Sequence, residues 1–221
     1  KQLFKDWELI IFNEGSSDNS SLIAKSFLLD NNSQNKITFI NNKEPKGLQC
    51  VANEAINLAT GEYIFRLDPD DWLDESALLV MHKKIESNPG CDLVYSDYYY
   101  TSEDGEIIGI DRQLKFDKDD KSGYLPPHGA CSLIRTRALK AIGGYSEEFN
   151  AQDGHELWFK LKSNMKSEHI SLPLFFYRQH GSSLSKNYQK IIQERQKIYK
   201  KLSEVKTGEY KLKVAALIPI K

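Results

Sequence analysis

Apolar runs and amphipathic stretches alternate along the first part of this chain. Short apolar runs at residues 7–12, 37–40 and 63–67 have the length and composition of buried strands. Between them, apolar residues recur at helical spacing, most clearly at positions 48, 51, 52, 55, 56 and 59, and Gly61 is expected to end that helix. Strands that alternate with helices predict an α/β fold with a mostly parallel sheet covered on both faces.

The pattern changes in the second part of the chain. Residues 92–101 and 107–110 are predicted to be two strands joined by a tight turn, which is an antiparallel excursion. Further elements are predicted as helices at 74–88, 135–142, 153–162 and 187–205, and as strands at 130–134 and 170–177. The long last helix is expected to bury one apolar face, made of Ile191, Ile192, Ile198, Tyr199, Leu202 and Val205. Gly143–Gly144 permits a close backbone approach.

Three carboxylates, Asp68, Asp70 and Asp71, follow the third apolar run. An extended segment projects residues i and i+2 to the same side, so Asp68 and Asp70 can face one crevice. Three like charges this close repel one another, and a divalent cation among them would relieve the repulsion. Mg²⁺ and Mn²⁺ both take carboxylate oxygens as ligands. From these residues alone, a metal site and an ordinary acidic turn capped by Asp74 are alternatives of equal weight.

Composition and charge limit the class of protein. The chain has 221 residues, of which 40% are hydrophobic and 28% charged, as is typical of a soluble globular protein. A net charge of −1 creates no field that attracts nucleic acid, so no nucleic-acid partner is expected. The three cysteines, Cys50, Cys91 and Cys131, are too widely spaced for a zinc site, and we expect buried thiols in the cytoplasm. The longest apolar run, residues 214–220, is too short to span a bilayer.

Several motifs, taken in order, resemble glycosyltransferase family 2, the inverting enzymes that use nucleotide sugars. The motifs are DWELIIFNEGSSDNS (6–20), GEYIFRLDPDDWL (61–73), AIGGYSEEF (141–149), QDGHELWFKL (152–161) and YRQHGSSLS (177–185). The resemblance covers nearly the whole chain, from residue 3 to residue 185. It implies a GT-A fold, which is Rossmann-like, with a mostly parallel central sheet, flanking helices, a small antiparallel excursion and a C-terminal helix.

The resemblance also implies the chemistry. A divalent metal, Mn²⁺ or Mg²⁺, would be held by three side chains: Asp70, Asp71 and His180. Such a metal stabilises the negative charge that grows on the departing diphosphate. Asp153 would be the general base that takes the proton of the acceptor hydroxyl, with Glu156 as the alternative, although a helix N-cap also explains Asp153. His155 is expected to face solvent or the acceptor, without a chemical role.

Contacts with the nucleotide-sugar donor are implied for seven residues: Asn13, Glu14, Gly15, Ser16, Lys46, Asp68 and Arg178. Arg178 could pair with a phosphate or anchor the end of its strand. Asn13 departs from the family pattern, which has an acidic residue there. The expected partners are a UDP-sugar as donor and a glycan or lipid-linked acceptor. The expected location is cytoplasmic, with peripheral association at the inner face of the membrane as an open alternative.

The motifs suggest a division of the chain. Residues 1–186 would form a glycosyltransferase domain without its first strand, and residues 187–210 a helical closing or linker segment. Residues 211–221 would begin a second domain, because AALIPIK (215–221) resembles the opening strand of sugar-activating cytidylyltransferases. We therefore expect the chain to be a fragment of a longer protein.

Two other functions are left open by the sequence. A nucleotidyltransferase shares the α/β layout and paired aspartates, but it normally opens with a loop rich in glycine and basic residues, unlike residues 13–21. A non-catalytic module that binds nucleotide sugars is the other alternative, which Asn13 and the missing first strand keep open.

Overall fold

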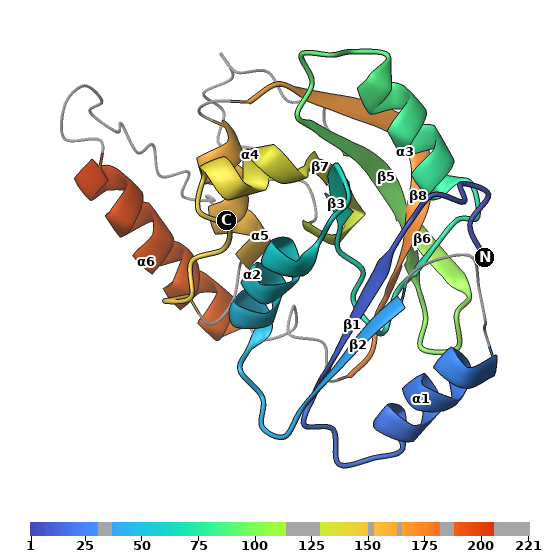
Figure 1. The fold of residues 1–221 in the computed structure, drawn as a ribbon. Helices are drawn as coiled ribbons and strands as arrows, with labels where there is room; N and C mark the ends of the chain where they lie inside the picture. The colour runs from blue at the N-terminus through green and yellow to red at the C-terminus, as the bar shows by residue number, and fades with distance from the viewer. Residues whose placement is uncertain (31–36, 114–128, 150–152, 163–164, 182–187, 206–221) are drawn as a thin grey trace, which may run out of the picture.

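The computed structural model describes residues 1–30, 37–113, 129–149, 153–162, 165–181 and 188–205 (Figure 1). The elements in chain order are β1 (Leu9–Glu14), α1 (Ser20–Asp30), β2 (Ile37–Asn42), α2 (Leu48–Leu58), β3 (Tyr63–Phe65), β4 (Trp72–Leu73), α3 (Ala77–Glu86), β5 (Leu93–Thr101), β6 (Ile107–Asp111), a 3-10 turn (Gly129–Cys131), β7 (Ser132–Arg135), α4 (Thr136–Ala141), α5 (Asp153–Lys162), β8 (Ser167–Arg178) and α6 (Tyr188–Val205). The predicted second domain at 211–221 lies outside the described residues, so the division of the chain stays a prediction.

The strands form two sheets. β1 and β2 pair in parallel, and the larger sheet has the order β3-β7-β5-β8-β4, with β6 paired to β5. In the described part of the larger sheet only β5 and β8 run parallel, and the other four pairs are antiparallel. The predicted hairpin of β5 and β6 is confirmed, whereas the prediction of mostly parallel strand pairs is wrong. Parallel neighbours need a crossover of a dozen or more residues, whereas β5 ends at Thr101 and β6 begins at Ile107, so these two strands can pair only in the antiparallel direction.

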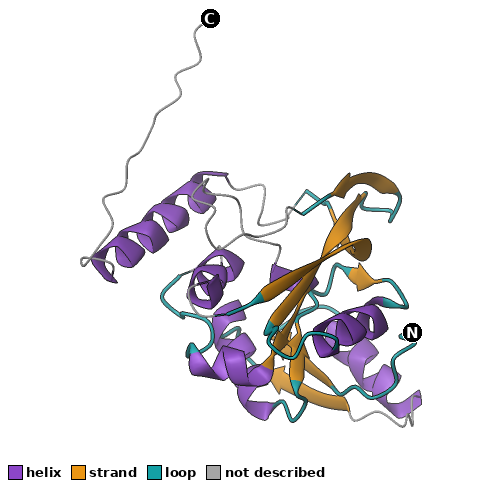
Figure 2. Cartoon of the chain, turned by 90° about the horizontal axis from the view of Figure 1, so that it is seen from above, coloured by secondary structure: helices purple, strands orange, loops and turns teal. Residues whose placement is uncertain are grey.

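Helices cover both faces of the larger sheet (Figures 1 and 2). Side chains alternate along β5, so Leu93 and Tyr95 pack into one cluster with Trp158 of α5. Val94 points to the other face and packs with Met81 of α3. This alternation fixes α5, and with it the candidate base Asp153, on one face of the sheet.

The inward face of α6 differs from the predicted one. Ile198 is buried as expected, but Ile192 and Tyr199 are 56% and 49% exposed. Glu194, which is not among the residues of the predicted apolar face, is 4% exposed. It lies one helical turn before Ile198, and its charge is offset by Lys197 at 2.6 Å. A carboxylate paired with a lysine thus lies on the inward face of α6, which was predicted to be made of apolar residues.

The cysteines and the apolar character of the helices were both considered in the sequence analysis. All three cysteines are free; Cys91 and Cys131 are buried, as predicted, whereas Cys50 is only partly buried. Burial raises the pKa of the Cys131 thiol to about 12, so this thiol is inert at neutral pH. None of the helices in the described ranges is both long and apolar enough to cross a membrane.

Candidate active site

The acidic turn after β3 is closed by its own backbone and by an arginine. The Asp71 N–H donates to the carbonyl of Asp68 across 3.2 Å. Arg66 holds both oxygens of the Asp68 carboxylate, with Nε 3.0 Å from Oδ1 and Nη2 3.1 Å from Oδ2. Nη2 donates a hydrogen bond to Oδ2, whereas the Nε–Oδ1 contact is an ion pair without hydrogen-bond geometry. Asp68, predicted to meet the donor, is therefore already neutralised by Arg66, a partner that the sequence analysis missed although it stands two residues away.

Asp70 and His180 are 110 residues apart in the sequence and come together in the fold. His180 Nε2 lies 2.8 Å from Asp70 Oδ2. The antiparallel pairing of β4 with β8, in which Trp72 faces Phe176, carries residues 70 and 178 past each other and explains the contact. Two of the three predicted metal ligands are thus in direct contact.

Asp71 takes a different position from the other two predicted ligands. Its Oδ1 accepts the Arg178 backbone N–H at 2.9 Å, and its side chain is buried. Its Oδ2 is buried with no hydrogen-bond partner among the described residues. Burial, and then the neighbouring Asp70 and Asp68 charges, raise the pKa of Asp71 to about 7 against the lowering by the Arg178 N–H. Within the described part of the chain, no three His, Cys, Asp or Glu side chains converge, so the predicted trio is not assembled.

The contact between Asp70 and His180 fits a divalent cation. In octahedral coordination at about 2.0–2.1 Å, two neighbouring ligands are about 3 Å apart, close to the observed Oδ2–Nε2 distance of 2.8 Å. A carboxylate oxygen and an imidazole nitrogen are both suitable donors for Mn²⁺. The unpartnered Oδ2 of Asp71 adds a buried carboxylate oxygen within the same turn. The residues present therefore fit a metal held by Asp70 and His180.

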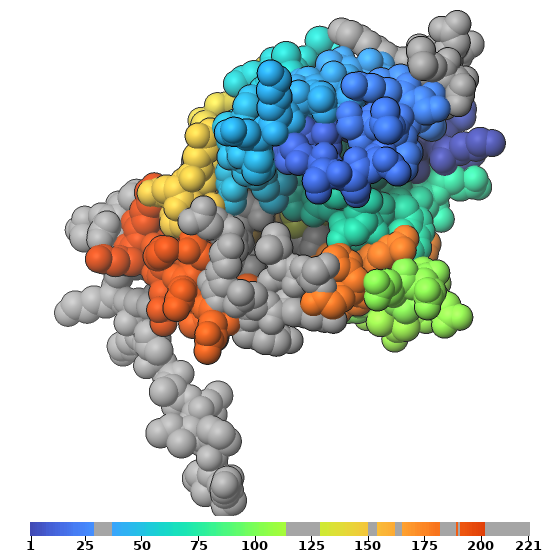
Figure 3. Space-filling model, turned by 90° about the horizontal axis from the view of Figure 1, so that it is seen from below, coloured from blue at the N-terminus to red at the C-terminus, as the bar shows by residue number. Residues whose placement is uncertain are grey.

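Arg178 anchors the end of β8. Its Nε donates to the carbonyl of Asp70 at 3.0 Å, and its Nη1 donates to the carbonyl of Glu103 at 2.7 Å. The guanidinium also lies over the Trp72 ring, 5.0 Å from its centroid. Figure 3 shows the β5–β6 hairpin beside the end of β8, where these contacts occur. The structure thus places Arg178 in the anchoring role, and its predicted contact with phosphate is not supported by this geometry.

Glu14 organises the loop that follows β2. Its Oε2 accepts the backbone N–H groups of Lys46 at 2.6 Å and Gly47 at 3.1 Å. Its Oε1 accepts a hydrogen bond from the Asn42 side chain. The Lys46 ammonium is paired with Glu54 at 2.8 Å. Glu14 and Lys46, both predicted to bind the donor, are thus close together, but each is held by partners within the chain.

The remaining predicted donor residues lie beside Glu14. Asn13 Nδ2 donates to Asn41 Oδ1 at 2.7 Å, which links the ends of β1 and β2. Gly15 has φ +69°, and an added Cβ would lie 3.0 Å from the Lys43 carbonyl oxygen, so only glycine fits there. Ser16 is exposed. The structure therefore brings Asn13, Glu14, Gly15 and Lys46 to one edge, at the carboxyl ends of a parallel strand pair.

The helix α5 begins at Asp153, as predicted. The first turn lies against the 3-10 turn, since a Cβ added to Gly154 would be 3.3 Å from Gly129 Cα. Glu156 is buried, accepts a hydrogen bond from Ser146 Oγ at 2.6 Å and pairs with Lys160 at 2.8 Å. Glu156 is therefore occupied as a structural ion pair, and its role as the alternative base is not supported.

His155 was expected to face solvent or the acceptor, and the first of these is wrong. Its side chain is 5% exposed and packs edge-on against Phe159 and Tyr199. Burial, and then the Arg195 charge, lower the pKa of His155 to about 4. His155 is thus a neutral core residue between α5 and α6 at neutral pH.

A glycine pair attaches the segment before α5 to α2. Gly143 and Gly144 both have positive φ, at +74° and +66°, and an added Cβ at Gly144 would collide with Asn53 Oδ1. Asn53 exchanges two hydrogen bonds with the Tyr145 backbone, at 2.9 and 2.8 Å. The close backbone approach predicted for these glycines is confirmed, and its partner is Asn53.

Solved structures share this fold. S. aureus TarS 1–349 in complex with UDP superposes with a TM-score of 0.65 at 15% identity, covering 89% of this chain and 57% of that chain. The mannosyltransferase PcManGT from Pyrobaculum calidifontis, in complex with GDP-Man and Mn²⁺, gives 0.66 at 13% identity, covering 89% and 55%. At this identity the likeness shows the fold alone. It confirms the predicted GT-A α/β class.

The chain belongs to glycosyl transferase family 2, whose model matches residues 1–143. Relatives include an uncharacterized glycosyltransferase of Methanocaldococcus jannaschii, 26% identical over 168 residues, which are 74% of this chain and 57% of the relative. The glucosyltransferase WfgD of Escherichia coli is 24% identical over 193 residues, covering 85% of this chain and 71% of WfgD. Streptococcus pneumoniae GlyG is 29% identical over 108 residues, covering 48% and 35%. The chain thus spans about half of the first relative and about a third of GlyG, and the predicted family is confirmed.

Proposed function

We propose that this chain catalyses transfer of a sugar, with inversion, from a nucleotide diphosphate sugar to a hydroxyl acceptor. The observation that carries the proposal is the contact of Asp70 with His180, beside the buried and unpartnered Oδ2 of Asp71. Solved neighbours in complex with UDP, UDP-GlcNAc and GDP-Man support a nucleotide-sugar donor, and we take a UDP-sugar as the donor here.

The metal site consists of Asp70 and His180, with Asp71 beside them. A bound Mn²⁺ or Mg²⁺ would supply positive charge to the diphosphate as it leaves. Asp70 and His180 are held for this task because Arg178 ties the Asp70 carbonyl to the end of β8. Arg66 neutralises Asp68, which lowers the repulsion within the turn.

Asp153 acts as the general base. Its carboxylate accepts the proton of the acceptor hydroxyl while the hydroxyl oxygen forms a bond to the anomeric carbon. The bond from that carbon to the diphosphate oxygen breaks, and its electron pair leaves with the diphosphate. The Asn53 hydrogen bonds and the Glu156–Lys160 pair hold the segment from which α5 starts. Their role is to position Asp153.

The donor nucleotide is expected at the ends of β1 and β2. Gly15 and Ser16 offer exposed backbone and hydroxyl groups there, next to the loop that Glu14 fixes. In the parallel part of an α/β sheet, ligands bind beyond the carboxyl ends of the strands. Glu14 and Lys46 serve this site by shaping the loop, and Lys46 reaches the donor only when it leaves Glu54.

The acceptor is proposed to be a glycan or a lipid-linked saccharide in bacterial surface polysaccharide synthesis. WfgD is a glucosyltransferase that acts on a sugar linked to diphosphoundecaprenol, which supports a lipid-linked substrate class. We accordingly propose a cytoplasmic location with peripheral contact to the inner face of the membrane. Vesicle flotation with and without anionic lipid tests the membrane contact.

Titration calorimetry with UDP tests the metal site. The wild type and the surface control Asp104→Asn should bind UDP with Mn²⁺ and lose most of that affinity with EDTA. Asp70→Asn and His180→Gln should each weaken Mn²⁺-dependent binding at least about tenfold, because each removes one ligand. Equal UDP affinity for all four proteins, with or without Mn²⁺, would refute the proposal.

A further inference from the structure

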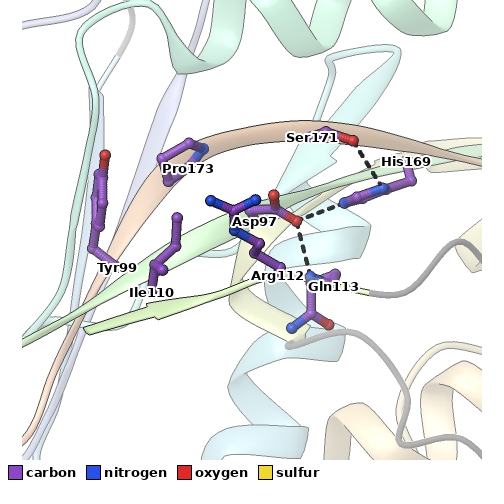
Figure 4. Close-up of a pocket in the computed structure, with 8 residues that line it drawn as sticks. All are labelled: Asp97, Tyr99, Ile110, Arg112, Gln113, His169, Ser171 and Pro173. Carbon is purple, nitrogen blue, oxygen red and sulfur yellow. Dashed lines mark hydrogen bonds and ion pairs between the residues drawn. The ribbon is translucent and has the colours of Figure 1, made fainter.

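A pocket opens where β5, β6 and β8 meet (Figure 4). Its volume is about 410 Å³, within the usual range of sites for small organic ligands. Pro173 lies on its wall and is five residues before Arg178 on β8, which is roughly 17 Å at the rise of an extended strand. The pocket is therefore separate from the Asp70–His180 pair.

An irregularity in β8 creates this pocket. Along the parallel pairing with β5, Ser96 faces Ile170, Asp97 faces Pro173 and Tyr98 faces Phe175. The register thus shifts on both sides of Asp97, and β8 has three extra residues there, Ser171, Leu172 and Leu174. Proline has no N–H to donate, and inside a sheet it is confined to edges and bulges. Bulges bend a strand and re-aim its side chains. The bulge separates the strands here and leaves space above Asp97.

The polar part of the pocket is fixed in place. Asp97 Oδ1 accepts hydrogen bonds from His169 Nε2 at 2.7 Å and from the Gln113 backbone N–H at 2.9 Å. Ser171 Oγ lies 3.5 Å from His169 Nδ1. Asp97 is 4% exposed, and a buried charged group is retained at an energetic cost. With the exposed Arg112, these side chains present both donors and acceptors to a ligand.

An apolar row leads from the acidic turn to the pocket. Trp72, next to Asp71, pairs with Phe176 across β4 and β8, and their rings stack 5.2 Å apart. Phe176 pairs in turn with Tyr99 of β5, and Tyr99 with Ile110 of β6. Directly paired residues project to the same face of a sheet. Tyr99 and Ile110 also line the pocket, so the row is continuous from one site to the other.

We propose that this pocket binds one sugar unit of the acceptor glycan, and that the row of Trp72, Phe176 and Tyr99 supports the units between it and the candidate active site. Sugars carry hydroxyls that need donors and acceptors together, and C–H faces that pack on apolar rings. This inference rests on the proposed function, because it takes the acceptor to be a glycan.

Filling the pocket tests the proposal. Ser171→Tyr places a ring in the cavity, and Leu172→Tyr is the matched control, since Leu172 lies in the same bulge, is 50% exposed and does not line the pocket. The probes are an immobilised array of bacterial oligosaccharides and UDP with Mn²⁺. Wild type and Leu172→Tyr should retain the same oligosaccharides, and Ser171→Tyr should bind them at least about tenfold more weakly. UDP affinity should be equal in all three.

A second variant covers the case in which Ser171→Tyr fails to fold, as judged by its thermal unfolding. Arg112→Ala changes an exposed residue at the rim and should lower oligosaccharide affinity several-fold. The proposal is overturned if the wild type retains no oligosaccharide, or if the folded pocket variants bind as the wild type does. If the wild type binds oligosaccharides but does not bind UDP, the result would instead overturn the donor site and support the pocket as a glycan site.

Discussion

Replacing Gly144 with alanine tests how the segment before α5 is held. Gly144 has φ +66°, and its added Cβ would collide with Asn53 Oδ1. The neighbouring Gly143 has φ +74°, but nothing lies within 4 Å of its added Cβ. The two glycines therefore share the backbone strain and differ in the collision, which makes Gly143→Ala the matched control.

The expected losses of stability follow from the backbone strain and from the collision with Asn53. A non-glycine residue in the left-handed region costs about 1–2 kcal/mol. The collision at Gly144 also displaces Asn53, whose two hydrogen bonds with Tyr145 are 2.9 and 2.8 Å long and contribute about 1 kcal/mol each. Gly144→Ala should thus lower the free energy of unfolding by about 3–4 kcal/mol, and Gly143→Ala by about 1–2 kcal/mol.

Urea unfolding of both variants, in the wild-type and the Asn53→Ala backgrounds, measures the difference. In the wild-type background Gly144→Ala should be about 2 kcal/mol less stable than Gly143→Ala. In the Asn53→Ala background the two glycine variants should become equal, because the collision partner is gone. Equal stabilities already in the wild-type background would refute the reasoning.

Three further predictions concern α5. Asp153→Asn should lower the transfer rate by about 10²–10⁴-fold and leave UDP binding with Mn²⁺ unchanged, and full turnover would remove Asp153 from the base role. Buried His155 has a pKa of about 4 in the folded protein, below its value in the unfolded chain, so the unfolded chain takes up a proton first as the pH falls. The stability that comes from keeping His155 neutral is therefore complete above the unfolded pKa and is lost as the pH falls toward 4. Wild type should therefore lose roughly 2 kcal/mol more than His155→Gln between pH 7 and pH 5 in urea unfolding, and parallel pH profiles would contradict this. Lys160→Met should cost about 3 kcal/mol, because it leaves the buried Glu156 carboxylate without its cation, and the double variant with Glu156→Gln should recover part of the loss, whereas no recovery would argue against a buried-charge effect.

Local patterns predicted the helices well. The bounds of α5, Asp153–Lys162, were predicted as observed, and α2 and the β5–β6 hairpin also lie where apolar spacing and turn residues put them. These elements depend on residues close in sequence, which a single chain displays directly. The glycine pair before α5 was also readable, because two adjacent glycines suggest a backbone that other residues cannot adopt.

Strand pairing and partner choice were not readable in the same way. The contact of Asp70 with His180 joins residues 110 positions apart and depends on the pairing of β4 with β8, so it entered only through the family resemblance. The apolar pattern of α6 did not predict that Glu194 is buried, because its burial depends on an ion pair with Lys197. Pro173 was an available signal that the sequence analysis did not use. A proline inside a predicted strand indicates a bulge, and that bulge opens the pocket at Asp97.

Donor hydrolysis tests the central claim most directly. The protein would be incubated with UDP-glucose, UDP-N-acetylglucosamine, UDP-galactose and GDP-mannose, with Mn²⁺ or with EDTA, and released nucleoside diphosphate would be measured. The account predicts Mn²⁺-dependent release from at least one donor, reduced at least about tenfold in Asp70→Asn and unchanged in Asp104→Asn. Release that is equal with EDTA, or equal in Asp70→Asn, would contradict a metal site built on Asp70 and His180.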